Sequence, residues 1–138
     1  MSEQNKAIAR RVFEEVWNQG NVDAIDELFA PDFVNHGAAP PEIPSDREGF
    51  KQLVAVYTSA FPDIHFHIED QIAEGDTVAT RWSGHGTHQG ELMGIPPTNK
   101  EVTVTGIVVD RIAGGAVAES WGEAGQMGMM QQLGVVPS

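Results

Sequence analysis

The chain has 138 residues, of which 41% are hydrophobic and 20% charged, and this suits one folded domain over residues 1–138. Its formal net charge of -12, with no basic run to offset it, argues against nucleic acid or an anionic membrane as partners. The absence of cysteine excludes disulfides, thiolate chemistry and sulfur-bound zinc. No apolar run approaches the roughly 18 residues of a membrane span, and the first residues lack a signal peptide's apolar core, so we expect a cytoplasmic protein.

Three helices are expected in the first part of the chain. Apolar residues recur every three or four positions over residues 3–18, which is the period of an amphipathic helix. A short second helix can be capped by Asp23 and is stopped by Pro31. Ser45 and Glu48 match a capping box, in which each side chain satisfies an exposed backbone N–H of the other residue, and they predict the start of a third helix.

After the third helix the apolar period changes to two, which predicts strands. In the third of these strands, Val102, Val104, Gly106 and Val108 share one face. Helices grouped ahead of an antiparallel meander predict an α+β protein whose curved sheet wraps around the N-terminal helices and forms an internal pocket. The expected strands are 64–73, 77–86, 101–112 and 116–123, with a short extended piece at 33–36 and a Met-rich closing helix or lid at 126–133.

The segment from Arg81 to Ile95 is the most informative stretch of the chain. It combines Trp82, His85 and His88 with four glycines. Glycines cluster where a backbone turns sharply or lets another group come close, and imidazoles donate and accept protons near neutral pH. We therefore expect this segment to line the pocket.

A set of short sequence stretches extends over nearly the whole chain in a characteristic order. They are Val16-Trp17-Asn18-Gln19-Gly20-Asn21, Phe33-Val34-Asn35-His36, Phe61-Pro62-Asp63, Glu74-Gly75-Asp76-Thr77, Gly86-Thr87-His88-Gln89-Gly90, Gly94-Ile95-Pro96-Pro97-Thr98, Glu119-Ser120-Trp121 and Gln131-Gln132-Leu133-Gly134. Together they resemble the SnoaL-like polyketide cyclases of the nuclear-transport-factor-like superfamily. The resemblance implies a cone in which helices pack into a strongly curved antiparallel sheet around a deep pocket.

The resemblance also implies a reaction: an intramolecular aldol condensation that closes the last ring of an aromatic polyketide ester, without metal or organic cofactor. In those cyclases the base is an aspartate four residues after the tryptophan that corresponds to Trp121, and here that position is Gly125. The nearest acid is Glu123, which in a regular strand faces the same side as Trp121. We therefore expect Glu123 to be the base, although a bulge at Gly122 or Gly125 would change the facing.

Two histidines, His36 and His88, are expected to assist Glu123 by hydrogen bonding to a substrate oxygen. His36 precedes a loop, so it either lies at the pocket mouth or bonds to loop backbone. His85 and His88 are three residues apart, and a metal site would need a third ligand that the spacing does not reveal, so no metal is expected. The pair instead shapes or polarises the pocket, or one of the two holds the loop in place.

Further side chains are candidates for binding the ligand. Trp82 and Trp121 offer flat surfaces to an aromatic ligand, although core packing explains one of them equally well. Arg111 could hold a carboxylate or ester oxygen, or pair with an acid such as Glu119. The expected ligand contacts are Trp82, Trp121, His85, Arg111, Tyr57 and Met127, the last as part of an adaptable hydrophobic wall or of the core.

Two functions follow from these features. The first is a cyclase, isomerase or dehydratase that acts on a hydrophobic, oxygenated small molecule by acid–base chemistry. The second is a non-catalytic binding or accessory protein, because Gly125 replaces the family's acid. Water activation by two acids, as in epoxide-opening relatives of the fold, is a weaker third possibility. An open curved sheet leaves one face to be covered, and the resemblance agrees, so a homodimer is expected.

Overall fold

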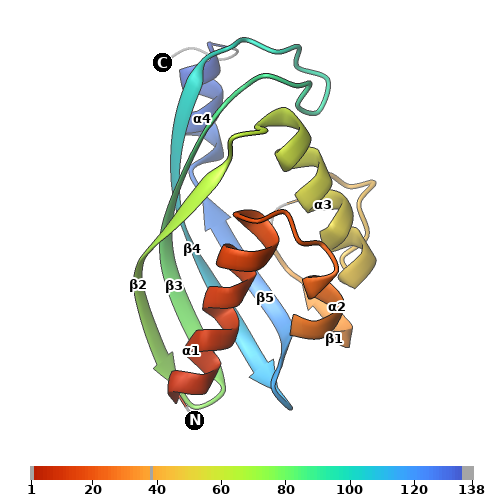
Figure 1. The fold of residues 1–138 in the computed structure, drawn as a ribbon, viewed down its shortest axis with the longest axis vertical. Helices are drawn as coiled ribbons and strands as arrows, with labels where there is room; N and C mark the ends of the chain where they lie inside the picture. The colour runs from red at the N-terminus through yellow and green to blue at the C-terminus, as the bar shows by residue number, and fades with distance from the viewer. Residues whose placement is uncertain (1, 38, 135–138) are drawn as a thin grey trace.

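The computed structural model describes residues 2–37 and 39–134. Helices α1, α2 and α3 lie on one face of a curved sheet, and α4 lies at one end of it (Figure 1). This arrangement confirms the expected α+β class. The elements in chain order are α1 (Ser2–Arg11), the π-helical η1 (Val12–Trp17), α2 (Ala24–Leu28), β1 (Phe29–Asn35), α3 (Arg47–Ala60), β2 (His65–Glu74), β3 (Thr77–Thr87), β4 (Glu101–Ala113), β5 (Ala116–Ala124) and α4 (Gln126–Leu133).

The sheet has the strand order β1-β5-β4-β3-β2. Strands β2 to β5 pair antiparallel to their neighbours, as expected, whereas β1 pairs parallel to β5 with Asn35 opposite Ser120. The extended piece expected at 33–36 is therefore part of a fifth strand. Pro31 lies inside this strand, and α2 has already ended at Leu28. An edge strand tolerates proline because one side of its backbone needs no partner.

The end of the first helix is attached to strand β2. Its last six residues are π-helical, and the backbone N–H of Asn18 bonds to the carbonyl of Phe13 at 2.9 Å. The Asn18 side chain then accepts from the Phe66 N–H at 2.8 Å and donates to the Phe66 carbonyl at 3.0 Å. This pair of hydrogen bonds joins the helix end to the strand, and the ring centroids of Phe13 and Phe66 lie 6.0 Å apart.

Helix α3 begins one residue later than expected. The Oδ1 atom of Asp46 accepts a hydrogen bond from the Gly49 N–H at 2.8 Å, so Asp46 is the N-cap. The expected capping box of Ser45 and Glu48 is therefore wrong. The backbone carbonyl of Ser45 instead accepts from the N–H of Asn35 at 2.7 Å, which ties the start of α3 to β1.

Replacing this cap should weaken the fold measurably. Asp46→Ala is expected to lower the free energy of unfolding by about 1 kcal/mol, because an exposed N–H of the first helical turn loses its acceptor. Ser45→Ala is the matched control and is expected to change it by less than about 0.5 kcal/mol, since only the Ser45 carbonyl is used. Urea denaturation followed by circular dichroism measures both, and equal losses in the two variants would contradict the cap.

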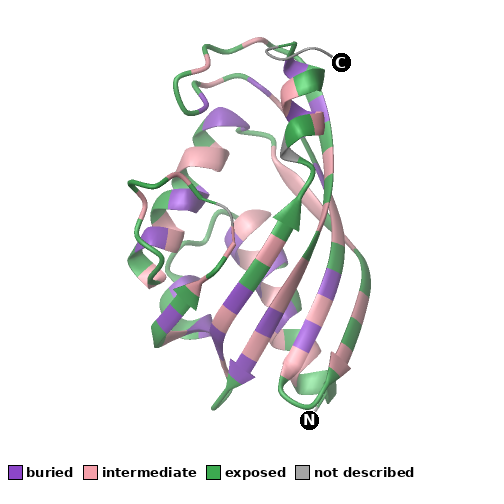
Figure 2. Ribbon diagram, turned by 180° about the vertical axis from the view of Figure 1, so that it is seen from behind, coloured by how far each residue is buried: buried purple, intermediate pink, exposed green. Residues whose placement is uncertain are grey.

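The core consists of two groups of buried residues. Buried and exposed residues alternate along the strands, as Figure 2 shows from the side away from the helices. The first group joins the N-terminal helices, β1 and the sheet, and it includes Val16, Ile25, Leu28, Phe33, Val54 and Val117. The second joins the end of α3, the segment 88–100 and α4, and it includes Phe61, Leu92, Val102, Met129 and Leu133. Among the described residues, no helix has the length and apolar character needed to cross a membrane.

Candidate active site

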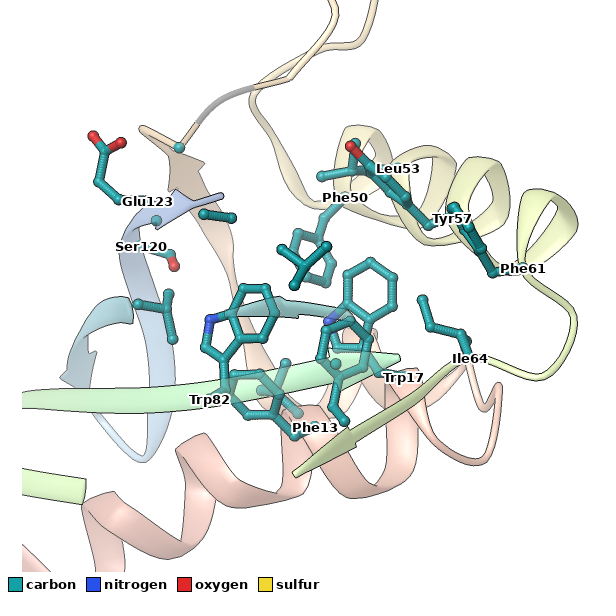
Figure 3. A pocket seen from close by; sticks show the side chains of 18 of the residues that line it. Phe13, Trp17, Phe50, Leu53, Tyr57, Phe61, Ile64, Trp82, Ser120 and Glu123 are labelled. Atoms are coloured by element: carbon teal, nitrogen blue, oxygen red, sulfur yellow. The ribbon is translucent and has the colours of Figure 1, made fainter. Parts of the chain in front are cut away.

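A cavity of about 380 Å³ lies between the helices and the sheet, in contact with both core groups. Its size is within the range of pockets for small organic molecules. Figure 3 shows Phe13, Trp17, Phe50 and Trp82 directed into the same space. We call the surrounding rings the aromatic belt, which consists of Phe13, Trp17, Phe50, Tyr57, Phe66 and Trp82.

Two glycines make room for the aromatic belt on the sheet. A Cβ atom on Gly84 would lie 2.8 Å from the ring of Phe66, and one on Gly106 would lie 2.5 Å from the indole of Trp82. The rings can therefore lie close against the strands, and those of Phe66 and Trp82 pack edge to face, with centroids 5.1 Å apart and planes at 69°. The result is a wall suited to a flat apolar ligand.

Asp110 is the only buried acid in the described part of the chain, and it borders the cavity. It is 6% exposed, and Ser120, which is 8% exposed, lies directly opposite on β5. Burial raises the pKa of Asp110 to about 6, and a hydrogen bond from Ser120 opposes the rise. A carboxyl that titrates near neutral pH in an apolar site suits general acid–base catalysis.

Asp110 was not among the site residues expected from the sequence, although the alternation of residues along its strand indicated an inward side chain. Val104 and Val108 were expected to share one face of their strand, and both line the cavity. Asp110 continues the same face two residues further on. An acid in phase with an apolar face is a candidate for a buried functional group, because an acid without such a role is rarely buried.

The last strand faces the other way from what was expected. Ser120 and Gly122 line the cavity, whereas Trp121 does not and is 41% exposed. The physical reason is a bulge at Ala118, where β5 has one residue more than β4. Glu123 borders the cavity but is exposed, and Figure 3 shows its carboxylate directed away from the aromatic belt, whereas the Ser120 hydroxyl points inward.

His36, Trp121 and Arg111 meet on the outer face of the sheet, outside the cavity. The rings of His36 and Trp121 stack at 4.9 Å and 13°. Glu119 accepts a hydrogen bond from Arg111 Nε at 2.7 Å, and His36 Nε2 lies 2.8 Å from its other oxygen. The bond from Arg111, and then that from His36, hold the pKa of Glu119 below its usual value. His36, Trp121 and Arg111 were expected to contact the ligand in the pocket, and this expectation is wrong because the three side chains lie together on the outer face.

The other expected residues divide between cavity and surface. Tyr57, Trp82 and His85 border the cavity, although His85 is exposed. His88 is fully buried outside the cavity, and its Nδ1 lies 3.1 Å from the Thr98 hydroxyl, so it holds the segment 88–100 together. Met127 is 66% exposed on α4, and Met129 lines the cavity instead.

Within the residues that the structure describes, no three His, Asp or Glu side chains are arranged to hold a metal ion. The cavity has the features of a small-molecule site with one buried carboxyl in its wall. The sequence model of the SnoaL-like polyketide cyclase family matches residues 7–133, and the chain belongs to that family.

Named relatives and a solved structure agree with this family. Nogalonic acid methyl ester cyclase of Streptomyces nogalater is 29% identical over 119 residues, which are 86% of this chain and 89% of that protein. The aklanonic acid methyl ester cyclase DnrD of Streptomyces peucetius is 29% identical over 138 residues, which cover 97% and 92% of the two chains. IdmH of Streptomyces antibioticus is 33% identical, with a TM-score of 0.83 and coverage of 95% and 99%. The expected cyclase family is confirmed, and these relatives favour an enzyme over a non-catalytic binding protein.

Proposed function

We propose that the chain catalyses the cofactor-free, intramolecular ring closure of a planar aromatic carbonyl compound. The methyl esters of nogalonic and aklanonic acid, which the names of the relatives specify, are the first substrates to test. The observation that carries this proposal is an aromatic cavity of about 380 Å³ with a buried carboxyl in its wall. Flat rings fit between the side chains of the aromatic belt, and the carboxyl supplies the acid–base chemistry.

The reaction needs one proton transfer in each direction. A carboxylate takes a proton from the carbon beside a carbonyl, and the electrons of the broken C–H bond pass into the enolate. The enolate carbon attacks a second carbonyl carbon of the same molecule and forms the new ring bond. The alkoxide produced on that second carbonyl takes the proton back from the carboxyl, so the carboxylate is regenerated and the substrate gains and loses no atoms.

The cavity contributes positioning and the exclusion of water. Holding the two reacting carbons in contact converts an encounter into a step within one bound molecule, which lowers the entropic barrier. An apolar wall also weakens the solvation of a carboxylate and so strengthens it as a base. Two acids border the cavity, Asp110 and Glu123, and the reaction needs only one carboxylate as its base.

Turnover is the direct test of this proposal. Purified protein incubated with either methyl ester is expected to yield a product of unchanged mass but altered retention time and absorption spectrum, because an aldol closure rearranges bonds without changing composition. Liquid chromatography with mass spectrometry measures both. Calorimetry on the same samples provides the binding control. An ester that binds and is recovered unchanged would show a binding protein and contradict the proposed enzyme.

The glycine at the family's acid position allows a second prediction. Gly125→Asp is expected to fold, because a Cβ there would meet only the Thr105 carbonyl at 3.8 Å and the residue is the N-cap of α4, where aspartate is favoured. If the wild-type protein already has a working base, turnover should stay within about tenfold of the wild-type rate. Activity that appears only in Gly125→Asp would show that Gly125 had abolished catalysis. Steady-state rates of both proteins decide between these outcomes.

The proposal includes a homodimer in the cytoplasm. Exposed apolar side chains on the outer face of the sheet, Trp121 and Ile107 among them, support a second copy as their cover. A chain without cysteine forms no disulfide and so does not need an oxidising compartment. Sedimentation equilibrium and fractionation of the source cells test the two statements, and a monomer at assay concentration or secreted protein would contradict them.

A further inference from the structure

We propose that Asp110, positioned by Ser120, is the base of this site and takes the place of the aspartate that the family has at the position of Gly125. This inference rests on the proposed function, since it assigns the group that removes the substrate proton. Its support is the geometry of β4 and β5, which favours Asp110 over Glu123, the base expected from the sequence.

The first support is that a ligand can reach the Asp110 carboxyl from the cavity alone. Its neighbours on the two adjacent strands, Val78 and Ser120, are themselves buried, with 0% and 8% exposure. Val108, on the same face of β4, lines the cavity, and so does Asp110. A carboxyl closed in on both flanks and bordering a cavity can meet a ligand only from that cavity.

The second support is the position of the competing groups. Glu123 is exposed, and its carboxylate is directed away from the aromatic belt (Figure 3). The backbone of Gly125 bonds to the Thr105 carbonyl at 3.0 Å, starts helix α4, and lies outside the lining of the cavity. Glu119 is held by Arg111 on the outer face. Asp110 is therefore the one acid of the described residues whose carboxyl is enclosed with the ligand space.

The third support is electrostatic. Burial is the main cause of the raised pKa of Asp110, and the hydrogen bond from Ser120 is the only opposing cause; no charged side chain of the described residues contributes. The carboxylate is thus ionised at neutral pH without an ion-pair partner that would compete for it. Such uncompensated burial is destabilising, and perturbed acids of this kind gather at functional sites.

The assignment gives the Asp110 carboxylate two tasks, which are to accept the hydrogen bond from Ser120 and to accept the substrate proton. The Ser120 hydroxyl donates to the carboxyl and so fixes its orientation. A carboxylate has several acceptor sites on its two oxygens, so it can still receive the substrate proton. The C–H electrons pass into the substrate carbonyl as the enolate forms, and the protonated Asp110 later returns the proton to the alkoxide. Ser120 is a positioning residue in this scheme.

Deuterium exchange of a simple ketone tests Asp110 separately from ring closure. The probe is 2-tetralone, a bicyclic ketone with an acidic CH₂ beside its carbonyl, in D₂O and followed by proton NMR. Wild-type protein is expected to accelerate exchange over buffer, Asp110→Asn to lose about 100-fold or more of that acceleration, and Glu123→Gln to keep it within about threefold. Circular dichroism confirms that each variant is folded.

The pH dependence identifies the role of Ser120. Ser120→Ala removes the hydrogen bond that lowers the pKa of Asp110, so the inflection of the exchange rate should move to higher pH, a shift that mere loosening of the fold would not produce. Retained exchange in Asp110→Asn, loss of exchange in Glu123→Gln, or no acceleration by the wild-type protein would each overturn the assignment. Exchange that depends on Asp110 while both methyl esters remain unchanged would instead refute the proposed ring closure and leave Asp110 as the base.

Discussion

Replacing Gly106 with alanine is expected to lower the free energy of unfolding by about 3 kcal/mol and to weaken the binding of aromatic ligands. The added Cβ would lie 2.5 Å from the indole of Trp82 and 2.6 Å from the backbone carbonyl oxygen of Glu123. The indole can move only toward the cavity, and the carbonyl belongs to the paired strand β5, so neither contact is relieved without loss of packing or sheet hydrogen bonds. Chemical denaturation and ligand titration measure the two effects.

Gly122 provides the matched control for this variant. It also lines the cavity, but a Cβ there would have only Val108 Cγ2 near it, at 4.0 Å. Gly122→Ala is expected to leave stability unchanged or to raise it by up to about 1 kcal/mol, because alanine loses less backbone entropy than glycine in a strand. Similar destabilisation in both variants would show that the close approach of Trp82 to Gly106 is not what makes glycine necessary there.

Replacing Asp110 with asparagine is expected to stabilise the protein at about pH 8 by about 2 kcal/mol. The pKa of Asp110 rises from 3.8 to about 6 on folding. That difference corresponds to about 3 kcal/mol at a pH where both states are ionised, and the buried amide of asparagine returns about 1 kcal/mol of it as desolvation. The carboxyl would thus be kept for its chemistry at the expense of stability.

The sign of the pH dependence follows from the raised pKa. Between pH 3.8 and about 6 the folded protein binds the proton that the unfolded chain has released, so the stability linked to Asp110 is fully present below this window and is lost as pH rises through it. The stabilisation by Asp110→Asn should therefore vanish at about pH 4. Urea denaturation at about pH 4 and about pH 8 measures it, with the exposed Glu123→Gln as the control that changes little at either pH. A gain that is equal at both pH values would contradict the raised pKa.

The two sets of experiments on Asp110 complement each other. The same substitution should remove proton transfer and add stability, an opposite pair of effects that is expected of a functional group and not of a structural one. A structural hydrogen-bonding partner would lower stability when replaced by asparagine, because the amide oxygen accepts more weakly from the Ser120 hydroxyl than a carboxylate does and the added NH₂ group needs a partner of its own. The combination therefore tests the role of Asp110 more strictly than either measurement alone.

Local patterns in the sequence determined most of the fold. The helical period over residues 3–18 and the alternation after residue 64 both correspond to observed elements, because each reflects burial of one side of a single segment. The parallel strand β1 was seen only as a short extended piece. Its pairing with β5 joins residues about 85 apart, and such a contact leaves no local period in the sequence.

The family and the presence of a pocket could likewise be predicted, since ordered motifs and the residues Trp82 and Tyr57 already indicated them. The inward face of β5 was decided only by tertiary structure, because the bulge at Ala118 arises from how β5 pairs with β4. The same pairing encloses Asp110 beside Ser120 and turns Glu123 outward. Which carboxyl loses its water depends on neighbours from other strands, and a pKa raised by burial is therefore a property of the assembled sheet.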